Sequence, residues 1–133
     1  MSAAPQQADI RFTQRDFSGI VVAMQIDRFV ERDIVITAVK GRLDSSSSHK
    51  LDEFLAAVPE GSSALVLDFA ELTYISSAGL RVVLKATKLA RGAGVPLVIC
   101  GLVPQVHEIF DVSGFTTLIP IHASRESALA SLP

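Results

Sequence analysis

Two short runs near the N-terminal end of the chain alternate apolar and polar side chains, the pattern of β-strands with one buried face. They cover residues 24–30 (MQIDRFV) and 34–39 (IVITAV), and the polar residues 31–33 between them favour a turn, so we expect a β-hairpin. Two later runs, ALVLDF at 64–69 and VPLVIC at 95–100, are almost continuously apolar. Runs of this kind are typical of strands that are covered on both faces of a sheet.

Apolar residues recur at helical spacing in the segments between and after these strands. In residues 49–58 they fall at i, i+3, i+4 and i+7, and the serine run at 45–48 supplies an N-cap for this helix. The same spacing, with Pro or Gly at the ends, predicts helices over 78–91 and 104–112, and Ser124 is placed to cap a last helix.

The order of these elements predicts how the sheet is built. Strand 64–69, helix 78–91 and strand 95–100 form a strand–helix–strand unit, in which we expect the two strands to run parallel with a right-handed crossover. A short strand at 118–121 is confined to the edge of the sheet because Pro120 has no amide hydrogen to donate. We therefore expect an α/β fold.

The N-terminal segment has a different composition. Residues 1–8 are mostly Ala, Pro, Gln and Ser, which bury too little apolar surface to offset the entropy of ordering them, so we expect a loose tail. The stretch IRFTQRDFSGIVV at 10–22 has short apolar patches around Gly19, which permits a frayed hairpin or an added edge strand. We divide the chain into an N-terminal extension, 1–23, and a folded domain, 24–133.

Composition narrows the class of protein. At 133 residues with 49% apolar side chains, the chain is long enough for one domain with a real core. A net charge of -2 at pH 7 lacks the basic excess that binding to nucleic acid backbones requires. The single cysteine excludes an intrachain disulfide, and no apolar run is long enough to span a bilayer. We expect a cytoplasmic protein that binds neither nucleic acid nor a membrane.

Residues that carry enzyme chemistry are scattered rather than clustered. The sequence has no glycine-rich nucleotide-binding motif, no HExxH zinc motif and no GxSxG nucleophile motif. His49, His107 and His122 fall on separate elements, and His107 with Asp111, at i and i+4, is more typical of a solvated helix pair than of a metal site. Cys100 ends an apolar strand, where a buried and inert thiol is the usual case. We expect no catalytic residue, no metal and no cofactor.

The junction after strand 64–69 is the strongest candidate for a functional site. Asp68 lies at the end of that strand, and Ser76 and Ser77 stand where the next helix begins. In open α/β sheets, binding surfaces collect where strands end and helices start. The simplest role of either serine is to cap the helix, but the free amides and the helix dipole there also tolerate a phosphate. A phosphate on Ser77 would add about -1.5 to -2 charges and would repel Asp68, and Asp44 if its loop lies close.

The helix that follows also carries a basic stripe. Arg81, Lys85 and Lys88 share one face at steps of four and three residues. Such a stripe near a helix C-terminus is usually a solvated surface. The alternative is that it meets acidic residues of a partner, with Ser77 one turn upstream.

Three blocks of the sequence, spread over roughly residues 24–132, resemble the STAS domain of anti-sigma factor antagonists, a family of small bacterial proteins that act in partner-switching pathways. The blocks are GRLD at 41–44, VLDFAELTYISSAGLRVVL at 66–84 and GVPLVICGLVPQVHEIFDVSGFTTLIPIH at 94–122, and the middle one is the most specific. The resemblance implies an α/β fold with a mixed β-sheet of four to six strands and about four helices packed mainly on one face. It also implies a regulatory binding protein rather than an enzyme.

The family pattern D-S-x-G-L falls on S-S-A-G-L in this chain, so the resemblance implies that Ser77 is the phosphoacceptor. Ser76 stands where many members have Asp, which makes it a possible second acceptor. In that family the unphosphorylated protein binds an anti-sigma factor, a serine kinase of the histidine-kinase-like ATPase type; phosphorylation breaks the complex, and a PP2C-type phosphatase reverses it. The residues expected to contact the partner surround the acceptor or belong to the basic stripe: Asp44, Asp68, Ser76, Ser77, Gly79, Arg81, Lys85 and Lys88.

The same fold allows a function of another class. STAS-like domains also occur as parts of transporters and of larger sensing assemblies, so this chain could sense a small ligand such as a nucleotide or lipid, or act as a scaffold. The sequence signals no aromatic-lined pocket for such a ligand. We therefore favour the phosphorylation-switched binding protein.

Overall fold

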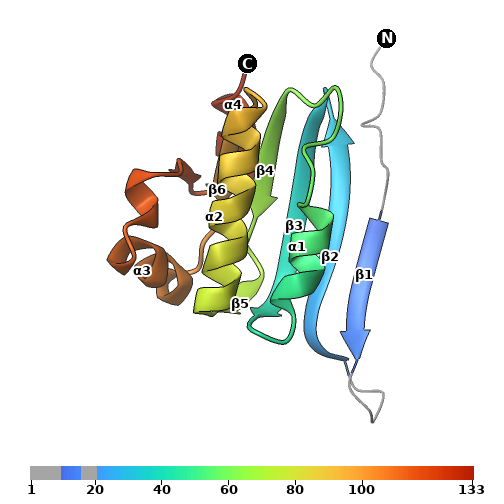
Figure 1. The fold of residues 1–133 in the computed structure, drawn as a ribbon. Helices are drawn as coiled ribbons and strands as arrows, with labels where there is room; N and C mark the ends of the chain where they lie inside the picture. The colour runs from blue at the N-terminus through green and yellow to red at the C-terminus, as the bar shows by residue number, and fades with distance from the viewer. Residues whose placement is uncertain (1–9, 16–20) are drawn as a thin grey trace.

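In the computed structural model, a seven-stranded mixed β-sheet runs through the described part of the chain, residues 10–15 and 21–133 (Figure 1). The strands are β1 (Ile10–Arg15), β2 (Val21–Glu31), β3 (Ile34–Leu43), β4 (Ala64–Asp68), β5 (Leu72–Ile75), β6 (Leu97–Cys100) and β7 (Ile121–His122). The helices are α1 (Ser48–Phe54), α2 (Ser77–Gly92), α3 (Pro104–Val112) and α4 (Arg125–Ala130), and a short 3-10 helix covers Phe115–Thr117.

The strand order confirms the predicted mixed sheet. Neighbouring strands follow the order β1-β2-β3-β4-β6-β7, and β5 pairs with the carboxyl-terminal part of β3. The β1–β2 and β2–β3 pairs are antiparallel, and the other four pairs are parallel. The sheet therefore has one strand more than the upper number that we expected.

β2 and β3 form the predicted hairpin, but both strands are longer than the sequence pattern indicated. Their ladder closes at the pair Glu31–Ile34. The turn residues Arg32 and Asp33 have φ angles of 51° and 64°, the positive values that a tight two-residue hairpin turn requires. Because β3 continues to Leu43, its end reaches the level at which α2 begins.

β4 and β6 are the predicted parallel neighbours at the centre of the sheet. Their register runs from Leu65 opposite Leu97 to Asp68 opposite Cys100. Every residue of both strands is buried, as expected for strands with helices on both sides. The connection between them passes through β5 and α2, so the predicted strand–helix–strand unit is confirmed.

Helices cover both faces of the sheet, but unequally (Figure 1). α1, α2 and α3 lie on one face, where their apolar residues join Leu65, Leu67 and Phe69 in the larger core cluster. α4 lies on the other face, where Ala128 packs against a smaller cluster that includes Val66. The prediction that the helices pack mainly on one face is confirmed, with α4 as the exception.

α1 is shorter than predicted and is capped differently. The predicted helix over 49–58 ends at Phe54, whose carbonyl accepts a hydrogen bond of 2.6 Å from Nη2 of Arg28 on β2. Pro59 also disfavours helical geometry in the residue before it. Ser47 occupies the N-cap position, but its hydroxyl donates to the carbonyl of Arg42 at 2.8 Å and makes no capping bond.

The sequence pattern missed β5 and misplaced the last strand. We expected a loop after strand 64–69, but residues 72–75 form β5, a short strand in which only the two end residues are buried. The predicted strand over 118–121 begins only after Pro120. The 3-10 helix ends at Thr117, and the carbonyl of its C-cap residue, Leu118, accepts a hydrogen bond of 2.6 Å from Arg91. The strand that does form, β7, lies at the edge of the sheet as predicted.

Part of the N-terminal extension adds a strand to the sheet. Residues 10–15 form β1, which pairs antiparallel with β2 and places Ile10 opposite Arg28. β2 begins at residue 21, within the segment that we assigned to the extension. The expected loose tail at 1–8 lies outside the described residues.

Candidate functional site

The ends of β3 and β5 come together where α2 begins. Leu43 pairs with Ile75, and the amide of Ser76 donates to the carbonyl of Leu43 at 2.9 Å. The loop that starts at Asp44 therefore lies beside the two serines, as the sequence analysis considered. Segments about thirty residues apart in the chain form this site.

Gly79 allows the first turn of α2 to lie this close to the strands, because it has no Cβ. A Cβ at this position would lie 2.8 Å from Cγ of Leu43 and 2.9 Å from Cγ1 of Ile75, both shorter than real contacts. Gly79 is also buried, so its part in the site is to seat the first turn of α2. We had expected it to contact the partner, which its burial prevents.

The two serines are held in different ways. Ser76 is the N-cap of α2: its side chain is half-buried and accepts a hydrogen bond from the amide of Gly79 at 3.4 Å. Ser77 is exposed in the first helical turn, and its hydroxyl makes no hydrogen bond with any part of the chain that the structure describes. Of the two hydroxyls, that of Ser77 is the one open to solvent.

The carboxylate of Asp44 organises the loop next to the serines. Its Oδ1 accepts hydrogen bonds from the hydroxyl of Ser46 at 2.7 Å, from the amide of Ser46 at 3.0 Å and from the amide of Ser47 at 3.2 Å. These bonds, the one from the Ser46 hydroxyl above all, hold the pKa of the Asp44 carboxyl below its usual value. Asp44 thus places a fixed negative charge near the start of α2.

Asp68 is not part of this site, in contrast to our expectation. Leu67 and Phe69 face α2, so the side chain of Asp68 between them points to the opposite face of the sheet. There it accepts a hydrogen bond of 2.8 Å from Nε of Arg125 in α4 and one of 3.0 Å from the amide of Ala70. Asp68 is 8% exposed, and the sheet lies between its carboxylate and α2. The predicted repulsion between Asp68 and a phosphate on Ser77 has no structural basis.

The basic stripe on α2 is exposed, but its three members are not equivalent. Nζ of Lys85 lies 3.2 Å from Oδ1 of Asp52, an ion pair that links α2 to α1. Arg81 and Lys88 have no charged partner within the described residues. Within the stripe, the cations that are open to a further acidic group are therefore Arg81 and Lys88.

α1 forms a second wall of the site that sequence reasoning missed. A shallow groove runs between α1 and the first half of α2, and Ala78, the residue after Ser77, is part of its lining. His49 had been considered only as an isolated histidine, and Asp52 had not been considered at all. The pairing of Asp52 with Lys85 could have been suspected only from their opposite charges. The groove is lined by Ser48, His49, Asp52, Ala78, Arg81, Val82 and Lys85.

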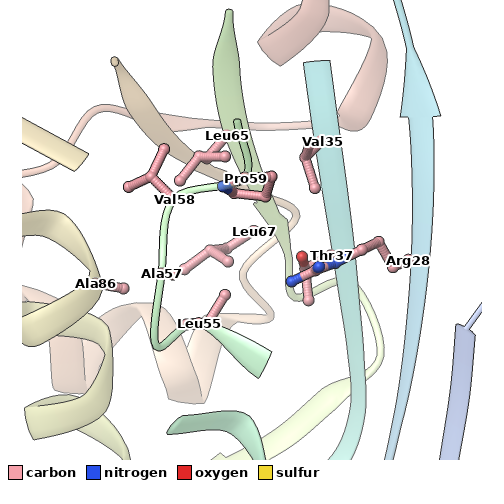
Figure 2. Close-up of a pocket in the computed structure, with 10 residues that line it drawn as sticks. All are labelled: Arg28, Val35, Thr37, Leu55, Ala57, Val58, Pro59, Leu65, Leu67 and Ala86. Atoms are coloured by element: carbon pink, nitrogen blue, oxygen red, sulfur yellow. The ribbon is translucent and has the colours of Figure 1, made fainter. Parts of the chain in front are cut away.

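A separate hollow lies beneath the loop after α1 (Figure 2). Arg28 reaches it from β2, and its buried Nε has no hydrogen-bond partner in the described structure. The free volume of about 10 Å³ accommodates roughly one water molecule, far less than a nucleotide or lipid needs. The other residues that line it are mainly apolar: Val35, Thr37, Leu55, Ala57, Val58, Pro59, Leu65, Leu67 and Ala86.

The remaining candidates for chemistry are dispersed. Cys100 is buried, and burial raises the pKa of its thiol to about 12, which makes it the inert thiol that we expected. Asp111 accepts a hydrogen bond of 2.9 Å from the hydroxyl of Thr116. Among the described residues, no group of three or more His, Cys, Asp and Glu side chains is placed to hold a metal ion. Nor does any described helix have the length and apolar character needed to cross a membrane.

Comparison with known proteins identifies the family. The family model for the STAS domain matches residues 25–128. BtrV of Bordetella bronchiseptica, described as an anti-sigma factor antagonist, is 43% identical over 99 residues, which are 74% of this chain and 85% of BtrV. An anti-sigma F factor antagonist of Paenibacillus polymyxa is 30% identical over 113 residues, 82% of this chain and 95% of that protein. This chain belongs to the STAS domain family, among the anti-sigma factor antagonists.

Solved structures agree at the level of the fold. An anti-sigma factor antagonist from Thermotoga maritima has a TM-score of 0.75 at 15% identity, over 80% of this chain and 93% of that one. The Bacillus cell fate determinant SpoIIAA in its phosphorylated form has a TM-score of 0.63 at 21% identity, over 82% of this chain and 98% of that one. At these identities the likeness concerns the fold alone.

Proposed function

We propose that this chain binds an anti-sigma factor in its unphosphorylated form and is released when Ser77 is phosphorylated. The observation that carries the proposal is the exposed and unbonded hydroxyl of Ser77, next to a serine that is already engaged as the helix cap. The names of the relatives, antagonists of anti-sigma factors, support the class of partner. The phosphorylated form of SpoIIAA supports the class of modification.

The kinase in this proposal is the bound anti-sigma factor itself, an ATPase of the histidine-kinase-like type. The Ser77 oxygen attacks the γ-phosphorus of ATP, the bond from that phosphorus to the β–γ bridging oxygen breaks, and ADP leaves while the hydroxyl proton is released. A PP2C-type phosphatase reverses the modification by hydrolysis, which consumes water and yields inorganic phosphate.

The added charge is large enough to act as a switch. A phosphoryl group carries about -1.5 to -2 charges at neutral pH. It would stand in the first turn of α2, near the loop that Asp44 organises and one residue before Ala78 of the α1–α2 groove. A loss of about 1.4 kcal/mol already weakens binding tenfold, and one buried or repelled anion in an interface exceeds that amount.

The contact surface that we propose surrounds this hydroxyl. It comprises Asp44, Ser76, Ser77 and the exposed cations of α2, and it includes the α1 side of the groove. Gly79 supports the surface from below. Asp68 lies outside it, on the other face of the sheet.

The test is a binding experiment with variants at one exposed hydroxyl. Tagged wild type, Ser77→Ala and protein with phosphoserine installed at position 77 would be used to capture partners, which mass spectrometry identifies. We expect wild type and Ser77→Ala to retain an ATPase-type anti-sigma factor and the phosphoserine form to lose it. Ser63→Asp, at an exposed serine before β4, controls for added charge elsewhere and should keep the partner. Equal capture by the phosphoserine form would overturn the proposal.

A further inference from the structure

We propose that the guanidinium of Arg81 forms an ion pair with a phosphate on Ser77 of the same molecule, so that phosphorylation also neutralises a basic side chain of the contact surface. This inference rests on the proposed function only in taking Ser77 as the modified residue. It concerns an interaction between two side chains of the modified chain, which does not require a bound partner.

The spacing on α2 places the two side chains together. Ser77 is the first residue of the helix, and Arg81 follows four residues later in the next turn. Residues at i and i+4 are neighbours on a helix surface, with Cβ atoms about 5–6 Å apart. An acidic group on the N-terminal side of a basic one is the more favourable of the two orders. A guanidinium also matches a phosphate with two parallel hydrogen bonds.

Arg81 is the cation of the stripe that is both near and free. It is exposed and has no charged partner within the described residues. Lys85 is held by Asp52 at 3.2 Å. Lys88 is eleven residues from Ser77, about 16 Å along the helix axis at 1.5 Å per residue, which exceeds the screening length at physiological salt.

Competing acidic groups near Arg81 are already engaged. Asp52 lines the same groove but pairs with Lys85. The carboxylate of Asp44 accepts hydrogen bonds from Ser46 and Ser47. The guanidinium of Arg81 therefore has no acidic partner within the described residues, and a phosphate on Ser77 would supply one.

The consequence is a double change at the contact surface. Before modification, Arg81 presents a positive charge beside a neutral hydroxyl. After modification, the same two positions present a paired phosphate with a net negative charge. An acidic group of a partner that contacts Arg81 would lose its counter-charge and gain a repelling one in a single step.

The test measures the phosphate directly and needs neither kinase nor partner. Phosphoserine is installed at position 77 during synthesis, and the second pKa of the phosphate, ordinarily near 6, is followed by phosphorus NMR at about 0.15 M salt, where a charge as distant as Lys88 is screened. Because a nearby cation favours the dianion, we expect this pKa to be about 0.2–0.4 pH units lower in the wild-type background than in Arg81→Ala. Arg81→Lys should retain most of the difference, and about 1 M salt should remove it.

Lys88→Ala is the matched control, since it removes an exposed cation of the same helix that lies too far away to act. We expect its phosphate pKa to equal that of wild type. Identical pKa values in wild type and Arg81→Ala would overturn the inference, as would a shift of equal size in Lys88→Ala. Backbone amide spectra of each variant report whether α2 is intact. If the phosphorylated chain kept its partner while this pKa difference was present, the proposed function would fail and the Arg81 contact would stand.

Discussion

The side chain of Ser76 accepts a hydrogen bond from the amide of Gly79 at 3.4 Å, and this contact distinguishes Ser76 from the adjacent Ser77. One hydroxyl closes the first turn of α2, and the other, on Ser77, stays in solvent. A substitution at either position should therefore affect a different property of the protein.

Replacing Ser76 by Ala should weaken folding but leave Ser77 available for phosphorylation. Loss of an N-cap removes about 1 kcal/mol from the free energy of unfolding, which for a chain of this size lowers Tm by about 4 °C. Ser76→Asp should restore the loss, because Asp is an equally good cap. Thermal unfolding of the three proteins measures this. A Ser76→Ala variant as stable as wild type would mean that the cap contributes nothing.

Gly79→Ala should be the more damaging change in the same turn. The new Cβ would lie 2.8 Å from Cγ of Leu43 and 3.0 Å from the Leu43 carbonyl oxygen, so α2 must move away from the strands. Overpacking of this kind reduces the free energy of unfolding by about 1–3 kcal/mol. Urea denaturation measures the loss. Partner affinity should fall as well, because the helix carries Ser77.

Gly92→Ala is the matched control for that substitution. It lies at the other end of α2, and a Cβ there would meet no atom within 4 Å. Ala also restricts the unfolded chain, so this variant should be as stable as wild type or gain up to about 1 kcal/mol. Equal losses for both glycines would argue against the steric account.

Arg125→Ala should destabilise the fold without affecting the Ser77 surface. Nε of Arg125 lies 2.8 Å from the Asp68 carboxylate, and its guanidinium also lies 5.2 Å from the ring of Phe29. Removing it leaves a buried carboxylate without its cationic partner, although the Ala70 amide still donates to it, and we expect a loss of about 1–3 kcal/mol in urea denaturation. Lys88→Ala, which breaks no contact, should change stability little. In Arg125→Ala, binding of the anti-sigma factor, corrected for the folded fraction, should be unchanged, because the sheet lies between the Arg125–Asp68 pair and α2.

The elements that the sequence predicted well are those whose pattern is long or whose ends carry strong signals. α2 and α3 follow a helical period over several turns, and Pro104 marks the start of α3. β5 was missed because it is short and because its pairing with β3 is a tertiary contact that no local pattern encodes. The same limit applies to Asp68: its partner Arg125 is 57 residues away, so the face on which the carboxylate is used could not be inferred.

The candidate site shows the same division. Its position, at two serines that begin α2, follows from residues that are adjacent in the chain, whereas the second wall follows from packing. Asp52 and Lys85 are 33 residues apart and meet only because α1 and α2 lie side by side. A sequence can indicate that a helix begins with two serines, but which of them caps the helix depends on how Gly79 seats the turn against Leu43.

The contribution of Asp44 to stability should depend on pH, and its direction follows from the lowered pKa. The folded state holds the Asp44 carboxyl pKa below its ordinary value of 3.8 through hydrogen bonds to the charged form. The stabilisation is therefore fully present above that value and is lost as pH falls through the lower pKa of the folded state. Asp44→Asn removes the charge with little change in shape, so it should be less stable than wild type at pH 7. The gap should narrow as the pH is lowered below 3.8. Urea denaturation of both proteins between pH 7 and pH 3 measures the gap, and a constant difference over that range would show that the charge of Asp44 does not organise its loop.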